Sequence, residues 1–103
     1  MSYFVDVTKT GIAVAGFRYS VTFEGSQELQ NDEFDGKCLN SKAHIVIRDG
    51  LSEAETSETI IHEILEAIKC QWNVKLEHDD LVRISRGLHQ VLTDLGIVFR
   101  KGV

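Results

Sequence analysis

A regular alternation of apolar and polar residues predicts β-strands in the first half of the chain. In the segment 17–23, Phe17, Tyr19, Val21 and Phe23 fall on one face, with polar residues between them. A period of two is typical of a half-buried strand. Shorter patterns of the same kind predict strands at 4–8, 12–15, 37–39 and 43–47, with a turn at 9–11 and a hairpin around 40–42.

The second half changes to helical periodicity. Ser52 and Glu55 have the spacing of a capping box, in which a hydroxyl and a carboxylate satisfy free amide groups at the start of a helix. We expect one helix at about 53–72 and a second at about 78–95, ended by Gly96. Their predicted core arcs are Ile60, Ile61, Ile64, Leu65, Ile68 and Trp72 in the first, and Leu81, Ile84, Leu88, Val91, Leu92 and Leu95 in the second.

These patterns predict an α+β fold. A small antiparallel sheet from the N-terminal half is expected to pack against the two C-terminal helices, with a strand at 97–99 joining the sheet. The acidic segment 24–36, rich in Asn, Asp and Gly, is expected to be a loop. The length of 103 residues suits a single domain over 1–103.

Composition narrows the possible partners. Eleven basic and 16 acidic residues give a net charge of −5, which disfavours binding to nucleic-acid phosphates. No apolar run reaches the ~20 residues of a membrane span, and residues 1–10 lack the basic and apolar parts of a signal peptide. The two cysteines are too few for a disulfide framework. We therefore expect a cytoplasmic protein with neither a nucleic-acid nor a membrane partner.

The candidate chemistry is concentrated in the helical segment 62–66, where His62 and Glu66 stand one turn apart. In H-E-x-x-H metallopeptidases two such His bind zinc, and the Glu after the first is the general base, here Glu63. A Glu in place of the second His can still bind zinc, but it leaves the bound water less acidic and hydrolysis slower. Acidic helices also carry this spacing by chance on solvated faces.

A third metal ligand is left open by the pattern. His78 and His89 are eleven residues apart on one side of the second helix, roughly 16 Å along its axis, so they cannot both bind one ion. Antiparallel helix pairing does not choose between them. The remaining candidates are His44, Glu77, Asp79 and Asp80.

A resemblance to a known family covers roughly residues 36–95. The segments that carry it are ETIIHEILEAI at 58–68, LEHDDLV at 76–82 and GLHQVL at 87–92, with the strand at 45–49 before them. They resemble small zinc metallopeptidases encoded by phages and prophages. The resemblance implies a minimal zincin-like fold, with His62 as first zinc ligand and Glu63 as general base.

The departures from the family pattern concern the other ligands. The family's second ligand falls on Glu66, and relatives with Glu there and a following L-E-H favour His78 as the compensating ligand. His89 stands where the family commonly has an aromatic residue, which suggests a packing position. The implied metal set is therefore His62, Glu66 and His78.

The expected function is a zinc-dependent hydrolase acting on a peptide or protein. Glu63 would take a proton from a bound water and pass it to the leaving amine. The strand 43–47 is expected to be a sheet edge that pairs with an extended substrate, with His44 or Arg48 stabilising the oxyanion. Arg48 as a plain solvated charge is the competing interpretation.

Two further classes stay open. The chain can be a catalytically degenerate relative that acts as a binding or structural module, or an interaction module without a metal. The carboxylates of Glu55, Glu58 and Glu66 also permit a harder cation such as manganese.

Overall fold

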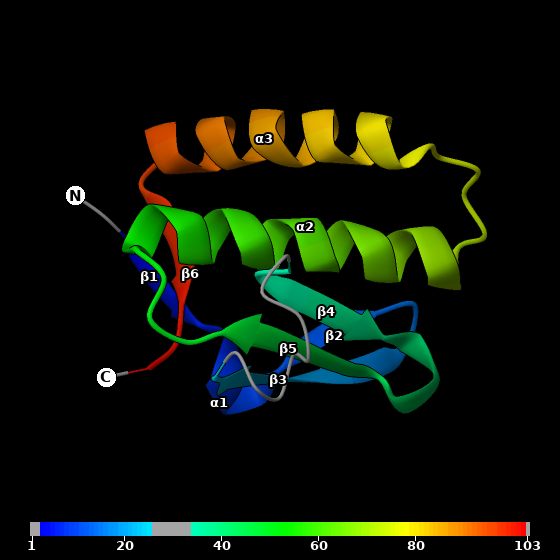
Figure 1. Ribbon diagram of the computed structural model, residues 1–103, viewed down its shortest axis with the longest axis horizontal. Helices are drawn as coiled ribbons and strands as arrows, with labels where there is room; N and C mark the ends of the chain where they lie inside the picture. Colours follow the sequence, from blue (N-terminus) through cyan, green and yellow to red (C-terminus); the bar gives the residue numbers. More distant parts are fainter. Residues whose placement is uncertain (1–2, 26–33, 103) are drawn as a thin grey trace.

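The computed structural model describes residues 3–25 and 34–102. Two long helices lie antiparallel on one side of a small β-structure (Figure 1). The helices are α1 (Val7–Thr10), α2 (Glu53–Gln71) and α3 (His78–Asp94), with a 3-10 turn η1 (Asn40–Lys42). The strands are β1 (Tyr3–Asp6), β2 (Ile12–Val14), β3 (Phe17–Glu24), β4 (Gly36–Leu39), β5 (His44–Arg48) and β6 (Ile97–Arg100).

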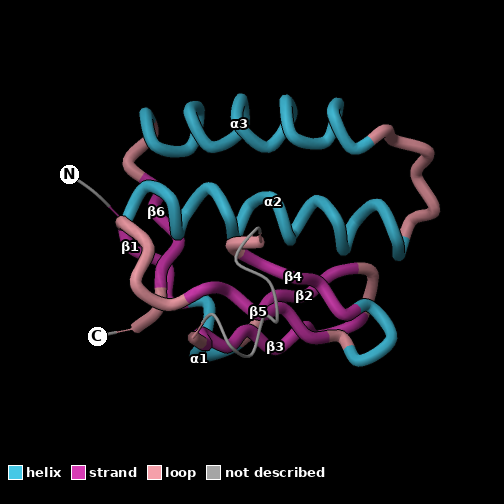
Figure 2. The backbone as a smooth tube through the Cα atoms, in the orientation of Figure 1, coloured by secondary structure: helices cyan, strands magenta, loops and turns pink. Residues whose placement is uncertain are grey.

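The strands form two sheets, traced in magenta in Figure 2. The larger sheet has the order β2-β3-β5-β4, with antiparallel pairs at its two ends and a parallel pair, β3 and β5, in its middle. The C-terminal strand β6 pairs in parallel with β1 as a separate two-stranded sheet. The α+β class is confirmed, whereas the purely antiparallel sheet was wrong, because alternation reveals a buried face but not the direction of the neighbouring strand.

The sheet order also corrects the predicted edge strand. β5 lies between β3 and β4, so it cannot offer a free edge to a substrate. Its residues Ile45 and Ile47 are completely buried, as expected for a central strand. Within the described residues β4 and β2 are the edges of this sheet.

The core lies between this sheet and α2. Tyr19 joins the two layers, because its hydroxyl accepts a hydrogen bond from Gln71 Nε2 at 2.7 Å and donates one to Asn40 Oδ1 at 2.8 Å. The buried side chains of this core are Val7, Val14, Tyr19, Val21, Ile45, Ile47, Ile60 and Ala67. The alternation that predicted β3 is confirmed by the burial of Tyr19 and Val21.

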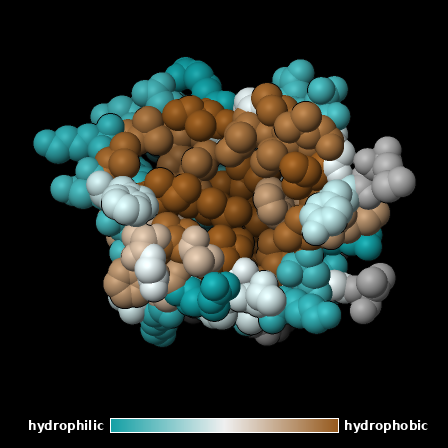
Figure 3. Space-filling view, turned by 180° about the vertical axis from the view of Figure 1, so that it is seen from behind, coloured by the Kyte–Doolittle hydropathy of each residue, from teal (hydrophilic) through white to brown (hydrophobic). Residues whose placement is uncertain are grey.

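Helix α3 packs on α2, on the side away from the sheet (Figure 1). Its Leu81 is fully buried, but Ile84, Leu88, Val91 and Leu95 are exposed, as is Trp72 after α2. The prediction that these five side chains belong to the core was therefore wrong. Because α3 is an outer layer, it contacts the rest of the fold through one flank only. Figure 3 shows a wide apolar surface on the back of the molecule.

The chain ends differ in detail from the expectation. The strand expected at 4–8 stops at Asp6, whose carboxylate accepts a 3.0 Å hydrogen bond from the Thr8 amide and caps the single turn α1. Gly11, with φ of 69°, then returns the chain into β2. Most of the loop expected at 24–36 lies outside the described residues. None of the described helices is both long and apolar enough to span a membrane.

Candidate metal centre

A cavity of about 400 Å³ lies between α2, α3 and the start of β4. It contains His62 and Glu63 of the sequence motif together with His78, the first residue of α3. The side chains and backbone that complete the lining are Phe34, Asp35, Gly36, Glu55, Glu58, Thr59, Val82, Ser85 and Arg86. Of the four residues predicted for the site, all but Glu66 therefore line the same cavity.

The rings of His62 and His78 meet edge to face, with centroids 5.8 Å apart and planes at 71°. In Figure 1 the connection after α2 extends past the end of that helix and turns back, so α3 begins beside the body of α2. From there the ring of His78 reaches that of His62, which lies near the middle of α2. Two imidazoles bound to one tetrahedral zinc at about 2.1 Å would have centroids roughly 5 Å apart, close to the spacing in the structure.

Burial controls the charge of His62. The side chain is half-buried, and this desolvation lowers the pKa of its imidazole, helped by the neighbouring His78 and opposed by Glu66 and Glu58. The neutral imidazole is the form that binds a metal. The lowered pKa of His62 therefore favours the protonation state that a metal ligand requires.

Glu63 is the buried carboxyl group of the cavity, with 6 % of its surface exposed. Burial raises its pKa to about 8, and the negative charge of Glu66 adds to this rise. Without a cation nearby, the carboxyl group is mostly protonated at neutral pH. A buried carboxyl group with a raised pKa in a hollow is a common feature of catalytic sites.

Gly36 brings the start of β4 close to Glu63 from the sheet side. A Cβ at Gly36 would lie 2.7 Å from Thr59 Cγ2 and 3.1 Å from a carboxylate oxygen of Glu63. Only glycine lets the start of β4 approach α2 this closely. Sequence reasoning missed Gly36, because its tight contact is made across the fold with residues more than twenty positions away.

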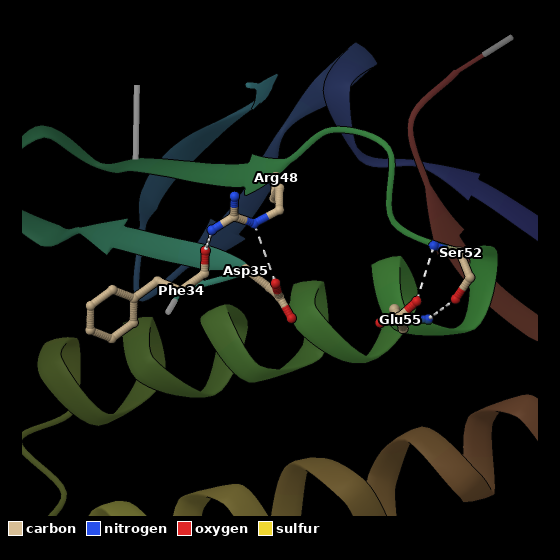
Figure 4. A network of polar contacts seen from close by, with 5 residues as sticks. All are labelled: Phe34, Asp35, Arg48, Ser52 and Glu55. Atoms are coloured by element: carbon tan, nitrogen blue, oxygen red, sulfur yellow. Dashed lines mark hydrogen bonds and ion pairs between the residues drawn. The ribbon is translucent and has the colours of Figure 1, made fainter. Parts of the chain in front are cut away.

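The rim of the cavity is held by Arg48 (Figure 4). Its guanidinium donates a hydrogen bond to the carbonyl oxygen of Phe34, and its Nε lies 3.4 Å from Asp35 Oδ1. The backbone amide of Arg48 also donates to the carbonyl oxygen of Asp35 at 2.7 Å. Arg48 does not line the cavity, so it positions the rim and does not face a reacting group.

The other predicted donors lie away from the cavity. Both ring nitrogens of His44 are bonded to β3, to Ser20 Oγ at 2.6 Å and Thr22 Oγ1 at 2.9 Å. His89 lines a separate hollow near the end of α3. Asp80 forms a 2.9 Å ion pair with Arg83. Neither these residues nor Glu77 and Asp79 line the cavity that holds His62.

Glu66 is half-buried on α2 beside the cavity rather than in its lining. Its charge still acts on the site, because it opposes the lowering of the His62 pKa and adds to the rise that burial causes in the Glu63 pKa. Among residues 3–25 and 34–102, no three His, Cys, Asp or Glu side chains converge as a ready metal site. The donor types fit zinc, but a third donor has to rotate toward the two imidazoles.

Sequence reasoning also missed the cation of the cavity lining. Arg86, on α3, lies 3.7 Å from Glu58 across the cavity mouth, as measured from its Nε to Oε1. The signal was present in the helical spacing, since positions 78, 82, 85 and 86 share one flank of α3. Without the relative placement of the two helices, that flank could not be linked to His62.

Comparisons of the chain with known protein families, with curated proteins and with solved structures find no match. The resemblance to phage zinc metallopeptidases and the zincin-like fold therefore stay predictions. The geometry and chemistry of the cavity are what support a function.

Proposed function

We propose that this protein is a metal-dependent hydrolase, with zinc as the expected metal and a peptide as substrate. The observation that carries the proposal is the pair of imidazoles, His62 and His78, facing one cavity beside the buried carboxyl group of Glu63. Three segments far apart in the sequence contribute to this cavity, which a solvated polar helix face would not require.

His62 and His78 would hold the metal, with Glu66 as the third ligand once its side chain turns toward them. Two His and one Glu are a known catalytic zinc set. When bound, zinc would acidify a water molecule and polarise the substrate carbonyl. Glu66 lies one turn after His62 on α2, so the two ligands come from one rigid element.

Glu63 is the proposed general base. Its carboxylate would accept a proton from the attacking water at an Oε atom and later donate it to the leaving amine. Contact with Gly36 and burial hold the carboxyl group in one place, which a proton relay needs because transfer requires hydrogen-bond distance.

An extended peptide is the substrate class that fits the surroundings. Strand β4 runs from the cavity at Gly36, and within the described residues it pairs only with β5. A peptide can add to such an edge through main-chain hydrogen bonds, which would bring one of its carbonyl groups to the cavity. Arg86 supplies a positive charge there for the oxygen that becomes negative during attack.

Zinc binding by the untagged protein is the first test, with two matched variants on α3. His78→Ala should lower zinc affinity in titration calorimetry by more than about 100-fold, beyond the range of outer-shell changes. His89→Ala makes the same change outside the cavity and should leave the affinity unaltered. Equal losses in both variants, or no zinc binding by the parent chain, would overturn the proposal.

Turnover is the second test. A peptide library incubated with the zinc-loaded protein should yield defined cleavage products, and Glu63→Gln should abolish them while keeping the bound zinc. Zinc binding that depends on His62 and His78 with no cleavage of any peptide favours the second candidate, a degenerate relative that keeps the metal and acts by binding.

A further inference from the structure

The exposed apolar residues of α3, together with its C-cap residue Leu95, form one narrow stripe. Ile84, Leu88, Val91 and Leu95 follow each other at spacings of four, three and four, and are 47, 38, 54 and 66 % exposed. This spacing is that of the seam in a coiled coil, where each side chain fits between residues of a facing helix. In Figure 3 the apolar surface on this side of the molecule is broad and continues below α3. A surface of this kind marks an interaction site.

The stripe is symmetric about its own centre. Positions 84 and 95 share a midpoint with positions 88 and 91, between residues 89 and 90. An antiparallel second copy of α3 would therefore place Ile84 against Leu95 and Leu88 against Val91, each contact occurring twice. Such a self-complementary patch is what a two-fold symmetric dimer requires.

Two charges along the border of the stripe are placed almost symmetrically about the same centre. Arg83 and Asp94 lie on its solvent side, and their midpoint is one residue from the centre of the stripe. In the antiparallel pair, Arg83 of one copy would lie within roughly 3 Å, along the helix axis, of Asp94 of the other. Parallel pairing would instead bring like residues together. Gly87, on the same border, has open space where a Cβ would be, so the backbones can approach closely.

We propose that this face of α3 binds a second copy of the chain, forming an antiparallel two-fold dimer. The stripe uses a different flank of α3 from the cavity, which takes His78, Val82 and Arg86 from that helix. Dimer formation therefore leaves the cavity open on each copy. The proposal is independent of whether the cavity binds a metal.

Sedimentation of the full chain tests the proposal. At about 10–100 µM, where a micromolar dimer is populated, the mass should be twice the 11.6 kDa of one chain. Val91→Glu should return the mass to that of the monomer, because it would place one negative charge from each copy near the symmetry axis of the apolar contact. Gln90→Glu adds the same charge next to it, off the stripe, and should leave the dimer intact. Circular dichroism checks that both variants fold.

A charge exchange tests the antiparallel orientation. Asp94→Lys alone should raise the dimer dissociation constant at least tenfold. The new lysine of each copy would face Arg83 of the other, so two positive charges would meet at each end of the interface. Arg83→Glu combined with Asp94→Lys should recover most of the loss. A monomeric parent chain, or a dimer that Val91→Glu leaves unchanged, would overturn the proposal. Failure of the double variant to recover would overturn the antiparallel arrangement.

Discussion

At the scale of single residues, Glu63 links stability and chemistry. The fold buries this carboxyl group and raises its pKa to about 8, so the folded state favours the protonated form. The unfolded chain ionises it near the ordinary value of 4.5. The same burial that makes Glu63 a candidate base therefore makes the metal-free protein sensitive to pH.

Stability of the chelator-treated protein should fall as pH rises. The contribution of Glu63 to the free energy of unfolding is fully present below about pH 4.5 and is lost as pH rises through about 8. The reason is that the unfolded state is stabilised by ionisation of this carboxyl group at a lower pH than the folded state. The loss is on the order of a few kcal/mol at most. Urea unfolding between pH 5 and 8 with a chelator present measures it, and Glu63→Gln should flatten the dependence.

The control for this measurement is Glu77→Gln, an exposed carboxylate that should keep the parental slope. His62 acts in the opposite direction. Its pKa is lower in the folded state than the ordinary 6.5, so its contribution to the free energy of unfolding increases as pH rises toward 6.5. A parent chain whose stability is flat from pH 5 to 8, with Glu63→Gln equally flat, would contradict the assignment of Glu63 as a buried neutral acid.

Gly36 gives a prediction about packing. Gly36→Ala should destabilise the fold by about 1–3 kcal/mol, because its Cβ would lie 2.7 Å from the Thr59 methyl group. Thr59→Ser removes that methyl group, so the double variant should recover part of the loss in urea unfolding. Additive losses in the double variant would show that the contact between β4 and α2 is not the cause.

At the scale of elements, local signals predicted the helices well. The Ser52 and Glu55 capping box is present, with the Glu55 amide donating to Ser52 Oγ at 3.2 Å and the Ser52 amide donating to Glu55 Oε1 at 3.3 Å (Figure 4). Both helices begin where the sequence predicted. Caps and periodicity depend on neighbours within a few residues, so one sequence is enough to detect them.

Ser52→Ala tests how much this cap stabilises α2. We expect a loss of about 0.5–2 kcal/mol in the free energy of unfolding, because the Glu55 amide loses its acceptor at the start of the helix. Ser41→Ala, an exposed serine in η1, is the matched control and should change stability little. A loss as large in Ser41→Ala would contradict the capping explanation.

The strands show where local signals stop. Alternation identified β3 and the hairpin of β4 and β5, but not the parallel contact of β3 with β5 or of β1 with β6. Those pairings join segments separated by more than a dozen residues. They depend on the global packing of α2, for example on the Ser57 hydroxyl, which accepts a 3.1 Å hydrogen bond from the Phe99 amide and attaches β6 to that helix.

At the scale of the whole molecule, the placement of His78 in the cavity and the exposed stripe have one origin. Both follow from how α3 lies on α2: one flank brings His78 to His62, and another leaves Val91 uncovered. The sequence contained both patterns: His78 was one of several candidate ligands, favoured by the resemblance, and the apolar positions of α3 were predicted as core. It could not assign either flank, because that needs the offset and rotation of the two helices.

The separation of these two flanks predicts that metal binding and dimer formation are uncoupled. Val91→Glu should yield a monomer whose zinc affinity per chain stays within about fivefold of the parent, because coupling energies below about 1 kcal/mol produce no larger change. Conversely, His78→Ala should lose zinc while keeping the mass of the dimer, because His78 lies on the cavity flank. Titration calorimetry and sedimentation of the same samples measure both quantities.

A zinc affinity that drops together with the dimer in Val91→Glu would show that the cavity needs the second copy, and that the two flanks of α3 act as one site.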